Sequence, residues 1–279
     1  MPRTVKIFEY LQHLDRRIIF LMLAIVVIIP MIKTFEMPVT VTPEVKKAYD
    51  EIEKLPEGTP IFMALDYDPG TAAEMAPLAE AVIKHAYSKN LKIVSSCLTA
   101  VGVSMIESTM KTMSSDFGKV YGKDYVFLGY KPYPAIVIMN MGESFRDPFP
   151  NDYYHNNLDD IPLMKGIKNF DNLGLVCVIT STSGIDMWLV YGQGKYRFPM
   201  ISGLSAVMAT DYYPFLYSGQ LKGLIAGLKG ASEYEKLIGK PAWATKGMVV
   251  QSFAHVLIVF FILICNICYF VTGKKERRL

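Results

Sequence analysis

The apolar positions of this 279-residue chain form two long runs near its ends and a series of short runs between them. The most continuous short run covers residues 173–180, L-G-L-V-C-V-I-T, and is followed by S-T-S-G. A short run without polar alternation is typical of a strand that is covered on both faces. We therefore expect a buried central strand at 173–180, a hydroxyl-rich turn, and a helix over 184–191.

Similar runs recur along the middle of the chain, separated by stretches with helical periodicity. Strands are expected at 61–65, 91–94, 125–130 and 198–201, and helices at 42–55, 71–88, 101–114 and 218–238. Strands that alternate with helices at this spacing pair in parallel through right-handed crossovers. The pattern predicts an α/β domain over residues 60–240, after a connector and helix at 34–59. Its fold would be an open, mostly parallel Rossmann-like sheet with helices on both faces.

Two segments of this domain are less regular. Residues 135–141 fit either a helix or a strand. Residues 143–172 are rich in Pro, Asn, Asp and aromatic residues and are expected to form a long loop. A loop of that length in a compact domain is uncommon and is often functional.

The two end runs predict two transmembrane helices, at 18–33 and 248–271. Fifteen apolar residues lie between Arg17 and Lys33, slightly fewer than the roughly 20 that a bilayer needs. A cleaved signal peptide would also fit this position, but no small-x-small cleavage site follows it. The second run has 24 residues. The segments 1–17 and 272–279 therefore flank the two spans.

The charge distribution differs between the middle and the ends. Residues 34–246 contain 20 basic and 23 acidic residues, whereas the ends contain 9 basic and 3 acidic residues. A weakly acidic middle without a basic stripe disfavours nucleic acid as a partner. Basic flanks are typical of the cytoplasmic side of a membrane. We expect a two-pass protein of the cell (inner) membrane, in contact with lipid, with both termini in the cytoplasm and the domain outside it.

Candidate chemistry lies where the predicted strands end, because ligands of doubly wound sheets bind beyond the carboxyl ends of the strands. The candidate ligand-contacting residues at these ends are Asp66, Asp68, Ser95, Ser96, Thr180, Ser181, Thr182, Ser183 and, through its backbone, Gly184. Backbone N–H groups at the start of the 184–191 helix could hold a small anion. Ser and Thr at a helix start are also explained as helix caps, which is the simpler interpretation.

The segment 61–71, I-F-M-A-L-D-Y-D-P-G-T, resembles the first motif of haloacid-dehalogenase-type phosphatases. The resemblance implies a metal-dependent hydrolase in which Asp66 is the nucleophile, Asp68 is the acid/base, and the pair binds Mg²⁺. The run V-C-V-I-T-S would be the second motif. The chain departs from the pattern at Gly70, where the family has Thr or Val, and no acidic pair follows a late strand. Asp-x-Asp-Pro-Gly is also ordinary turn chemistry, and no other cofactor is predicted.

The domain has two histidines, and neither predicts a nucleophilic triad. His85 falls in the middle of a predicted helix and is expected to be a surface or packing residue. His155 falls among the Tyr and Asn residues of 151–157, which could bind a small polar ligand or only decorate a loop. No G-x-S-x-G, Walker loop or G-x-G-x-x-G occurs at a strand–helix junction.

Regularly spaced glycines suggest close packing. Gly219, Gly223 and Gly227 would share one face of the predicted 218–238 helix. An interior Gly costs about 1 kcal/mol relative to Ala, so a close backbone approach is expected, either to the sheet or to a second subunit. Polar residues interrupt the second span at Gln251, His255 and Asn266. Such residues usually face another helix, and a proton or ion path is the alternative.

Residues 121–130 (Y-G-K-D-Y-V-F-L-G-Y) and 219–235 (G-Q-L-K-G-L-I-A-G-L-K-G-A-S-E-Y-E) resemble a family of uncharacterised bacterial membrane-anchored α/β proteins. The resemblance covers about residues 60–238. It implies a bacterial membrane protein and brings no catalytic residues with it. We expect a non-enzymatic structural or scaffolding subunit of a membrane-associated assembly, as a homo-oligomer or with other membrane-protein subunits. A hydrolase centred on Asp66 and Asp68 and a small-anion-binding domain are the alternatives.

Overall fold

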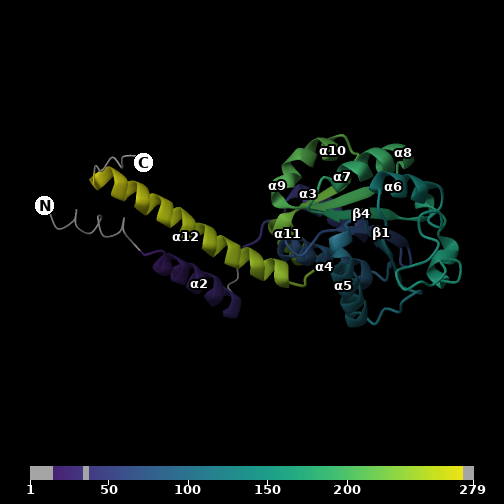
Figure 1. Cartoon of the computed structure of the whole chain (residues 1–279), viewed down its shortest axis with the longest axis horizontal. Helices are drawn as coiled ribbons and strands as arrows, with labels where there is room; N and C mark the ends of the chain where they lie inside the picture. Colours follow the sequence, from purple (N-terminus) through teal and green to yellow (C-terminus); the bar gives the residue numbers. More distant parts are fainter. Residues whose placement is uncertain (1–14, 34–37, 273–279) are drawn as a thin grey trace. The chain divides into compact units, whose positions relative to one another are not determined.

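The larger of two compact units carries the predicted sheet. A computed structural model describes residues 15–33 and 38–272. Residues 39–245 form one unit, and the described residues among 1–38 and 246–279 form the other. Within these described residues, six parallel strands follow the order β3-β2-β1-β4-β5-β6. Their bounds are β1 Pro60–Asp66, β2 Lys92–Cys97, β3 Tyr125–Tyr130, β4 Leu175–Thr180, β5 Met200–Leu204 and β6 Gly223–Ala226. Figure 1 shows the sheet, with β1 and β4 labelled, between layers of helices.

The apolar run at 173–180 forms the inner strand β4, which is buried at every position and lies between β1 and β5. Strand β1 shows why such runs lack alternation. Ile61, Met63 and Leu65 belong to the core on one face of the sheet. Phe62 and Ala64 belong to the core on the other face. Both faces are dry, so both sets of alternate positions are apolar.

Helices cover both faces of the sheet, which confirms the α/β class. One face packs against α3 (Pro43–Glu53), α4 (Ala72–Ser88), α5 (Val103–Asp116) and α11 (Gly227–Leu237). The other face packs against α6 (Pro134–Glu143), α7 (Gly184–Met187), α9 (Ala206–Ala209) and α10 (Tyr213–Tyr217). Helix α7 continues through a π-helical segment, Trp188–Gln193, into α8 (Gly194–Tyr196). The segment 135–141, which the sequence left open between helix and strand, lies within α6 and is helical.

The long loop between α6 and β4 is packed rather than extended. It contains two short 3₁₀ helices, Pro162–Gly166 and Phe170–Asn172. Its side chains Phe145, Phe149 and Leu158 are fully buried in the second core. This loop therefore supplies part of the apolar cover of the sheet.

The predicted helix over 218–238 is wrong in its first half. Gly219 lies in a turn with φ +77°, Gly223 begins β6, and Gly227 opens α11 with φ +56°. The three glycines therefore do not share a helix face, because two of them serve turns that need a left-handed backbone. The expected close approach exists at Gly223, where an added Cβ would lie 2.3 Å from the Ala48 nitrogen of α3.

The α/β unit fixes the start of the last helix, α12 (Trp243–Thr272), with a buried carboxylate. Glu235 is 1 % exposed and accepts hydrogen bonds from the N–H groups of Ala242, Ala244 and Thr245 at 2.8, 3.0 and 2.9 Å. The Thr245 hydroxyl also donates to it at 2.6 Å. The first N–H groups of a helix lack intrahelical partners. At the start of α12, the Glu235 carboxylate is the acceptor for these groups.

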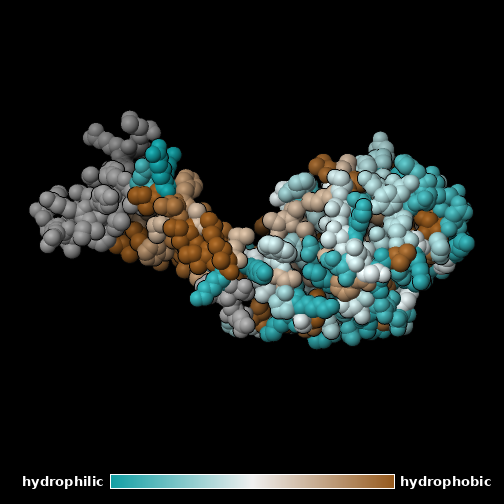
Figure 2. Space-filling view, turned by 90° about the horizontal axis from the view of Figure 1, so that it is seen from below, coloured by the Kyte–Doolittle hydropathy of each residue, from teal (hydrophilic) through white to brown (hydrophobic). Residues whose placement is uncertain are grey.

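One described helix is long and apolar enough to cross a membrane, over Trp243–Phe270, with a mean hydropathy of 2.5. The first predicted span, 18–33, coincides with α2 (Arg16–Ile32), whose 17 residues stand at the short limit for a span. Figure 2 shows hydrophobic residues gathered over the segment that contains α2 and α12, and mainly hydrophilic residues on the visible face of the α/β domain. The two-span architecture is thus shown only in part. The tails 1–14 and 273–279 lie outside the described residues.

Candidate functional site

The strand order creates a topological switch point between β1 and β4. Strands β2 and β3 lie on one side of this pair, and β5 and β6 lie on the other. Open α/β sheets bind ligands in the crevice at the carboxyl ends of such strands. A cavity of about 100 Å³ lies there, lined by Asp66, Leu98, Thr99, Pro134, Thr182 and Gly184. That volume has room for a few waters or one small ion, because a single water needs roughly 10–15 Å³.

Of the residues that the structure describes, Asp66 is the only acidic one that lines this cavity. It ends β1 and is 2 % exposed. The Leu98 N–H donates to its Oδ1 at 2.5 Å, and this is the only hydrogen bond to the carboxylate within the described chain. The Thr180 hydroxyl donates to the backbone carbonyl of Asp66 at 3.0 Å. The Asp66 main chain is therefore braced, while its side chain is sparsely bonded.

Burial decides the charge of Asp66. Desolvation raises the pKa of this carboxyl to about 7, and the Leu98 N–H and the Trp188 indole N–H partly oppose the rise. A charged group in an apolar site is disfavoured unless it is well paired. Asp66 is therefore poised between carboxylic acid and carboxylate near neutral pH.

Three other buried polar groups on this side of the sheet have no hydrogen-bond partner within the described chain: the Ser96 hydroxyl, the Trp188 indole N–H and the Gln193 side-chain carbonyl at the far end of the π-helical segment. Ser96 pairs with Ala64, so it shares a sheet face with Asp66. Trp188 is near enough to Asp66 to lower its pKa, although the contact lacks the geometry of a hydrogen bond. An unpaired buried polar group costs about 1–3 kcal/mol, so each one calls for an explanation.

The structure brings together only part of the predicted set. Asp66, Thr182 and Gly184 line the cavity, and Thr180 braces it by hydrogen bonds to Asp66 and to Thr182. The remaining residues have other partners or positions. Ser95 donates to the Val126 carbonyl, Ser181 donates to Thr71, and Ser183 is exposed without a capping bond. Strand alternation places Ser95 and Ser96 on opposite faces of β2.

The two aspartates of the Asp-x-Asp motif do not share the cavity. The Asp68 carboxylate accepts from the Thr71 N–H at 3.0 Å and from its hydroxyl at 3.2 Å. Asp68 thus holds the turn before α4, as the turn interpretation predicts. The described residues contain no group of three or more His, Cys, Asp or Glu that could hold a metal ion. Magnesium binding stays a prediction.

Cys97 and Cys177 are free, buried thiols. Burial raises the pKa of both to about 12. The thiolate is the nucleophilic form of cysteine, so neither residue is a ready nucleophile at neutral pH.

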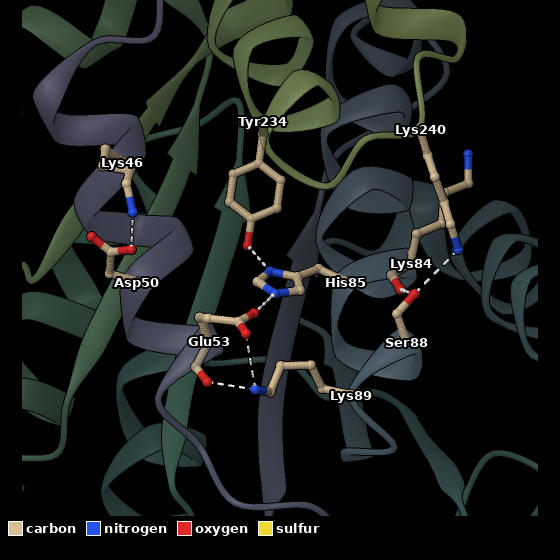
Figure 3. Close-up of polar contacts among 9 residues, drawn as sticks. All are labelled: Lys46, Asp50, Glu53, Lys84, His85, Ser88, Lys89, Tyr234 and Lys240. Carbon is tan, nitrogen blue, oxygen red and sulfur yellow. Dashed lines mark hydrogen bonds and ion pairs between the residues drawn. The ribbon is translucent and has the colours of Figure 1, made fainter.

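His85 is buried and joins three helices (Figure 3). Its Nδ1 lies 2.8 Å from the Tyr234 hydroxyl, and its Nε2 lies 2.9 Å from Glu53 Oε2. Its ring stacks on Tyr49 at 4.5 Å. Burial lowers the pKa of His85, and the hydrogen bond to Glu53 only partly opposes this. A neutral imidazole that donates from Nε2 to Glu53 and accepts at Nδ1 from Tyr234 satisfies both hydrogen bonds, so His85 is a packing residue. These partners lie 32 and 149 positions away in the chain, so the sequence does not reveal them.

A larger cavity of about 760 Å³ lies at the carboxyl end of β3, against residues 150–155. The sequence signal for it is the cluster of Tyr, Asn and His residues in the long loop.

No family model, curated protein or solved structure matches the chain. The resemblance of residues 121–130 and 219–235 to a membrane-anchored family therefore stays a prediction.

Proposed function

We propose that this protein is a membrane-anchored, non-enzymatic subunit whose α/β domain binds a small anion at the β1–β4 switch point. The observation that carries the proposal is the cavity of about 100 Å³ beside Asp66, Thr182 and Gly184. Small ligands bind in concave sites with a few convergent polar groups, and strongly perturbed pKa values mark such sites.

The groups around the cavity favour an anion over a cation. When Asp66 is protonated, it is a hydrogen-bond donor, and the Thr182 hydroxyl becomes a second donor if it turns away from the Thr180 Oγ1, which lies 3.1 Å from it. The unpaired Ser96 hydroxyl and Trp188 N–H stand on the same side of the sheet. A bound anion would repel the ionised carboxylate and hold the proton on Asp66. Anion binding is therefore coupled to protonation of Asp66.

The test is sulfate binding to the full chain in detergent micelles, measured by isothermal titration calorimetry at pH 6 and pH 8. Sulfate keeps the same charge over this range. Because the pKa of Asp66 is about 7, binding to the wild type should be about tenfold weaker at pH 8. Asp66→Asn mimics the protonated acid and should bind equally at both pH values. Asp68→Asn is the control and should keep the wild-type dependence.

Each alternative predicts a different result. A metal site needs the ionised Asp66 carboxylate, so divalent cations would bind more tightly at pH 8 and Asp66→Asn would abolish binding. Absence of sulfate binding in both the wild type and Asp66→Asn would refute the anion site. Hydrolysis of a phosphate ester that depends on Mg²⁺ and on both aspartates would support the hydrolase instead.

The membrane part of the proposal rests on α12. We propose two spans, both termini in the cytoplasm, the domain outside, and contacts with lipid and other subunits. Gln251 and His255 are exposed on α12 four residues apart, whereas the Asn266 amide donates to the Ile262 carbonyl one turn away. Polar side chains in a lipid-facing helix favour a partner helix. Crosslinking in membranes should therefore give a defined oligomer that Gln251→Leu weakens, and a strict monomer would contradict this part.

A further inference from the structure

The larger cavity at the carboxyl end of β3 is separate from the Asp66 site, because the two cavities share no lining residue. Its polar and aromatic lining includes Tyr130, Lys131, Asn151, Tyr153, Tyr154 and His155. A volume of about 760 Å³ falls in the range of small-molecule sites, roughly 300–1,000 Å³. From this lining and the fixed loop, we infer that the cavity binds a short saccharide.

The loop that forms one wall is held in place by a buried carboxylate. Asp152 is 4 % exposed and accepts from the Tyr154 and Asn156 N–H groups at 2.9 and 2.8 Å. It also accepts from the Asn156 amide at 3.0 Å and the Tyr121 hydroxyl at 2.6 Å. All of its hydrogen-bonding capacity is engaged inside the protein, so Asp152 shapes the wall rather than binding the ligand.

A second contact joins the loop to the sheet. The Tyr153 N–H donates at 3.0 Å to the carbonyl of Phe127, a residue of the edge strand β3. The Tyr153 ring packs on Phe127 with ring centroids 5.2 Å apart. The wall is therefore fixed before any ligand arrives, which lowers the entropy cost of binding.

The surfaces offered to a ligand are aromatic rings with polar groups between them. Tyr130, Tyr153 and Tyr154 are 37, 37 and 43 % exposed. Within the described chain, the hydroxyls of Tyr130 and Tyr153 and the side chains of Asn151 and His155 make no hydrogen bond. The Tyr154 hydroxyl is already used, because it donates to Glu107.

These surfaces match a sugar ring better than other small ligands. A sugar has an apolar C–H face that packs on an aromatic ring and a rim of hydroxyls that donate and accept hydrogen bonds. Tyr presents an apolar body with a polar tip, as such a ligand requires. Among the described residues, Lys131 is the one cation of the lining; its ammonium lies 5.8 Å from the Phe149 ring centroid and disfavours a quaternary ammonium ligand. A single cation also provides too little charge for a polyphosphate.

The test uses the full chain in a detergent without a sugar headgroup, because such a headgroup would compete. Maltotriose, cellotriose and the trimer of N-acetylglucosamine are titrated separately by calorimetry. At least one should bind with a Kd below about 1 mM. Tyr130→Ala removes a stacking ring and should weaken that binding about tenfold, whereas Tyr130→Phe should retain most of it.

The matched control is Tyr217→Ala, a tyrosine 80 % exposed on α10 and absent from the cavity lining. It should bind as the wild type does, and so should Asp66→Asn, because the two cavities are separate. Circular dichroism of each variant checks that the fold is intact. The inference is wrong if none of the three saccharides binds the wild type below about 1 mM, or if Tyr130→Ala and Tyr217→Ala weaken binding equally.

Discussion

Replacing Asp66 with Asn should stabilise the protein at alkaline pH and have little effect at acid pH. The carboxyl is buried and has one hydrogen bond, from the Leu98 N–H. An Asn carbonyl can accept that bond in the same place, and the amide carries no charge to desolvate. The substitution therefore removes the cost of ionising a buried acid while it keeps the packing of the β1 end.

The magnitude follows from the pKa, which burial raises from 3.8 to about 7. Between these values the folded protein keeps a proton that the unfolded chain has lost, so the free energy of unfolding falls as pH rises. Each pKa unit corresponds to about 1.4 kcal/mol, so the full cost above pH 7 is on the order of 4 kcal/mol. Asp66→Asn should recover up to this amount at pH 8 and almost none at pH 4.

The assay is thermal unfolding of the full chain in micelles, followed by circular dichroism from pH 4 to pH 8. A gain of 4 kcal/mol corresponds to a rise in Tm on the order of 10 °C for a domain of this size. The comparison of variant with wild type cancels the titration of other groups. Asp68→Asn is the control: its amide oxygen can still accept from Thr71, so it should not reproduce the gain in Tm at pH 8. A difference between Asp66→Asn and the wild type that does not change with pH would refute the reasoning.

Three further predictions concern packing and use the same assay. Gly223→Ala should lower the free energy of unfolding by about 1–3 kcal/mol, because its Cβ would lie 2.3 Å from the Ala48 nitrogen. The Cβ of Gly219→Ala would meet no described atom within 4 Å, so this variant should lose only the stability that backbone strain at φ +77° costs. Equal losses of stability in the two variants would contradict the clash between position 223 and Ala48. Glu235→Gln should lower the free energy of unfolding by about 1.5–3 kcal/mol, because its hydrogen bonds to the start of α12 would be weaker. An unchanged Tm would contradict this capping role. His85→Gln should abolish a loss of stability below about pH 6.5, because burial lowers the pKa of His85 and only the unfolded chain gains the proton there; a retained slope would contradict this.

The sequence predicts the sheet well because burial on both faces leaves a local signal. The run at 173–180 is apolar at successive positions and becomes β4, and the runs at 61–65 and 125–130 become β1 and β3. Glycine spacing was a poorer guide. A repeat of four residues suits one face of a helix, but it also suits a turn, a short strand and a second turn, which is what residues 219–227 form.

The sequence predicts the region in which the small cavity lies, but not which residues line it. The rule that ligands bind at carboxyl strand ends locates the region from sequence. Strand alternation then separates Ser96 from Ser95, and turn hydrogen bonds remove Asp68 and Ser181 from the cavity. The unpaired Trp188 N–H could not be foreseen, because it reaches Asp66 from more than 100 residues away in the chain.

The proposed anion site is also motivated by the energetics of the switch point. Asn at position 66 would fill the same space at a lower cost near neutral pH, and the unpaired Ser96 and Trp188 groups add about 1–3 kcal/mol each. Ala64 and Val94 beside Ser96 show that apolar residues fit this face, so the packing of the sheet does not need a hydroxyl at position 96. Local features that lower stability without a gain in packing concentrate at functional sites. In the anion site that we propose, the ligand would accept from the protonated Asp66 carboxyl, which lines the cavity, whereas Ser96 and Trp188 are not among the lining residues.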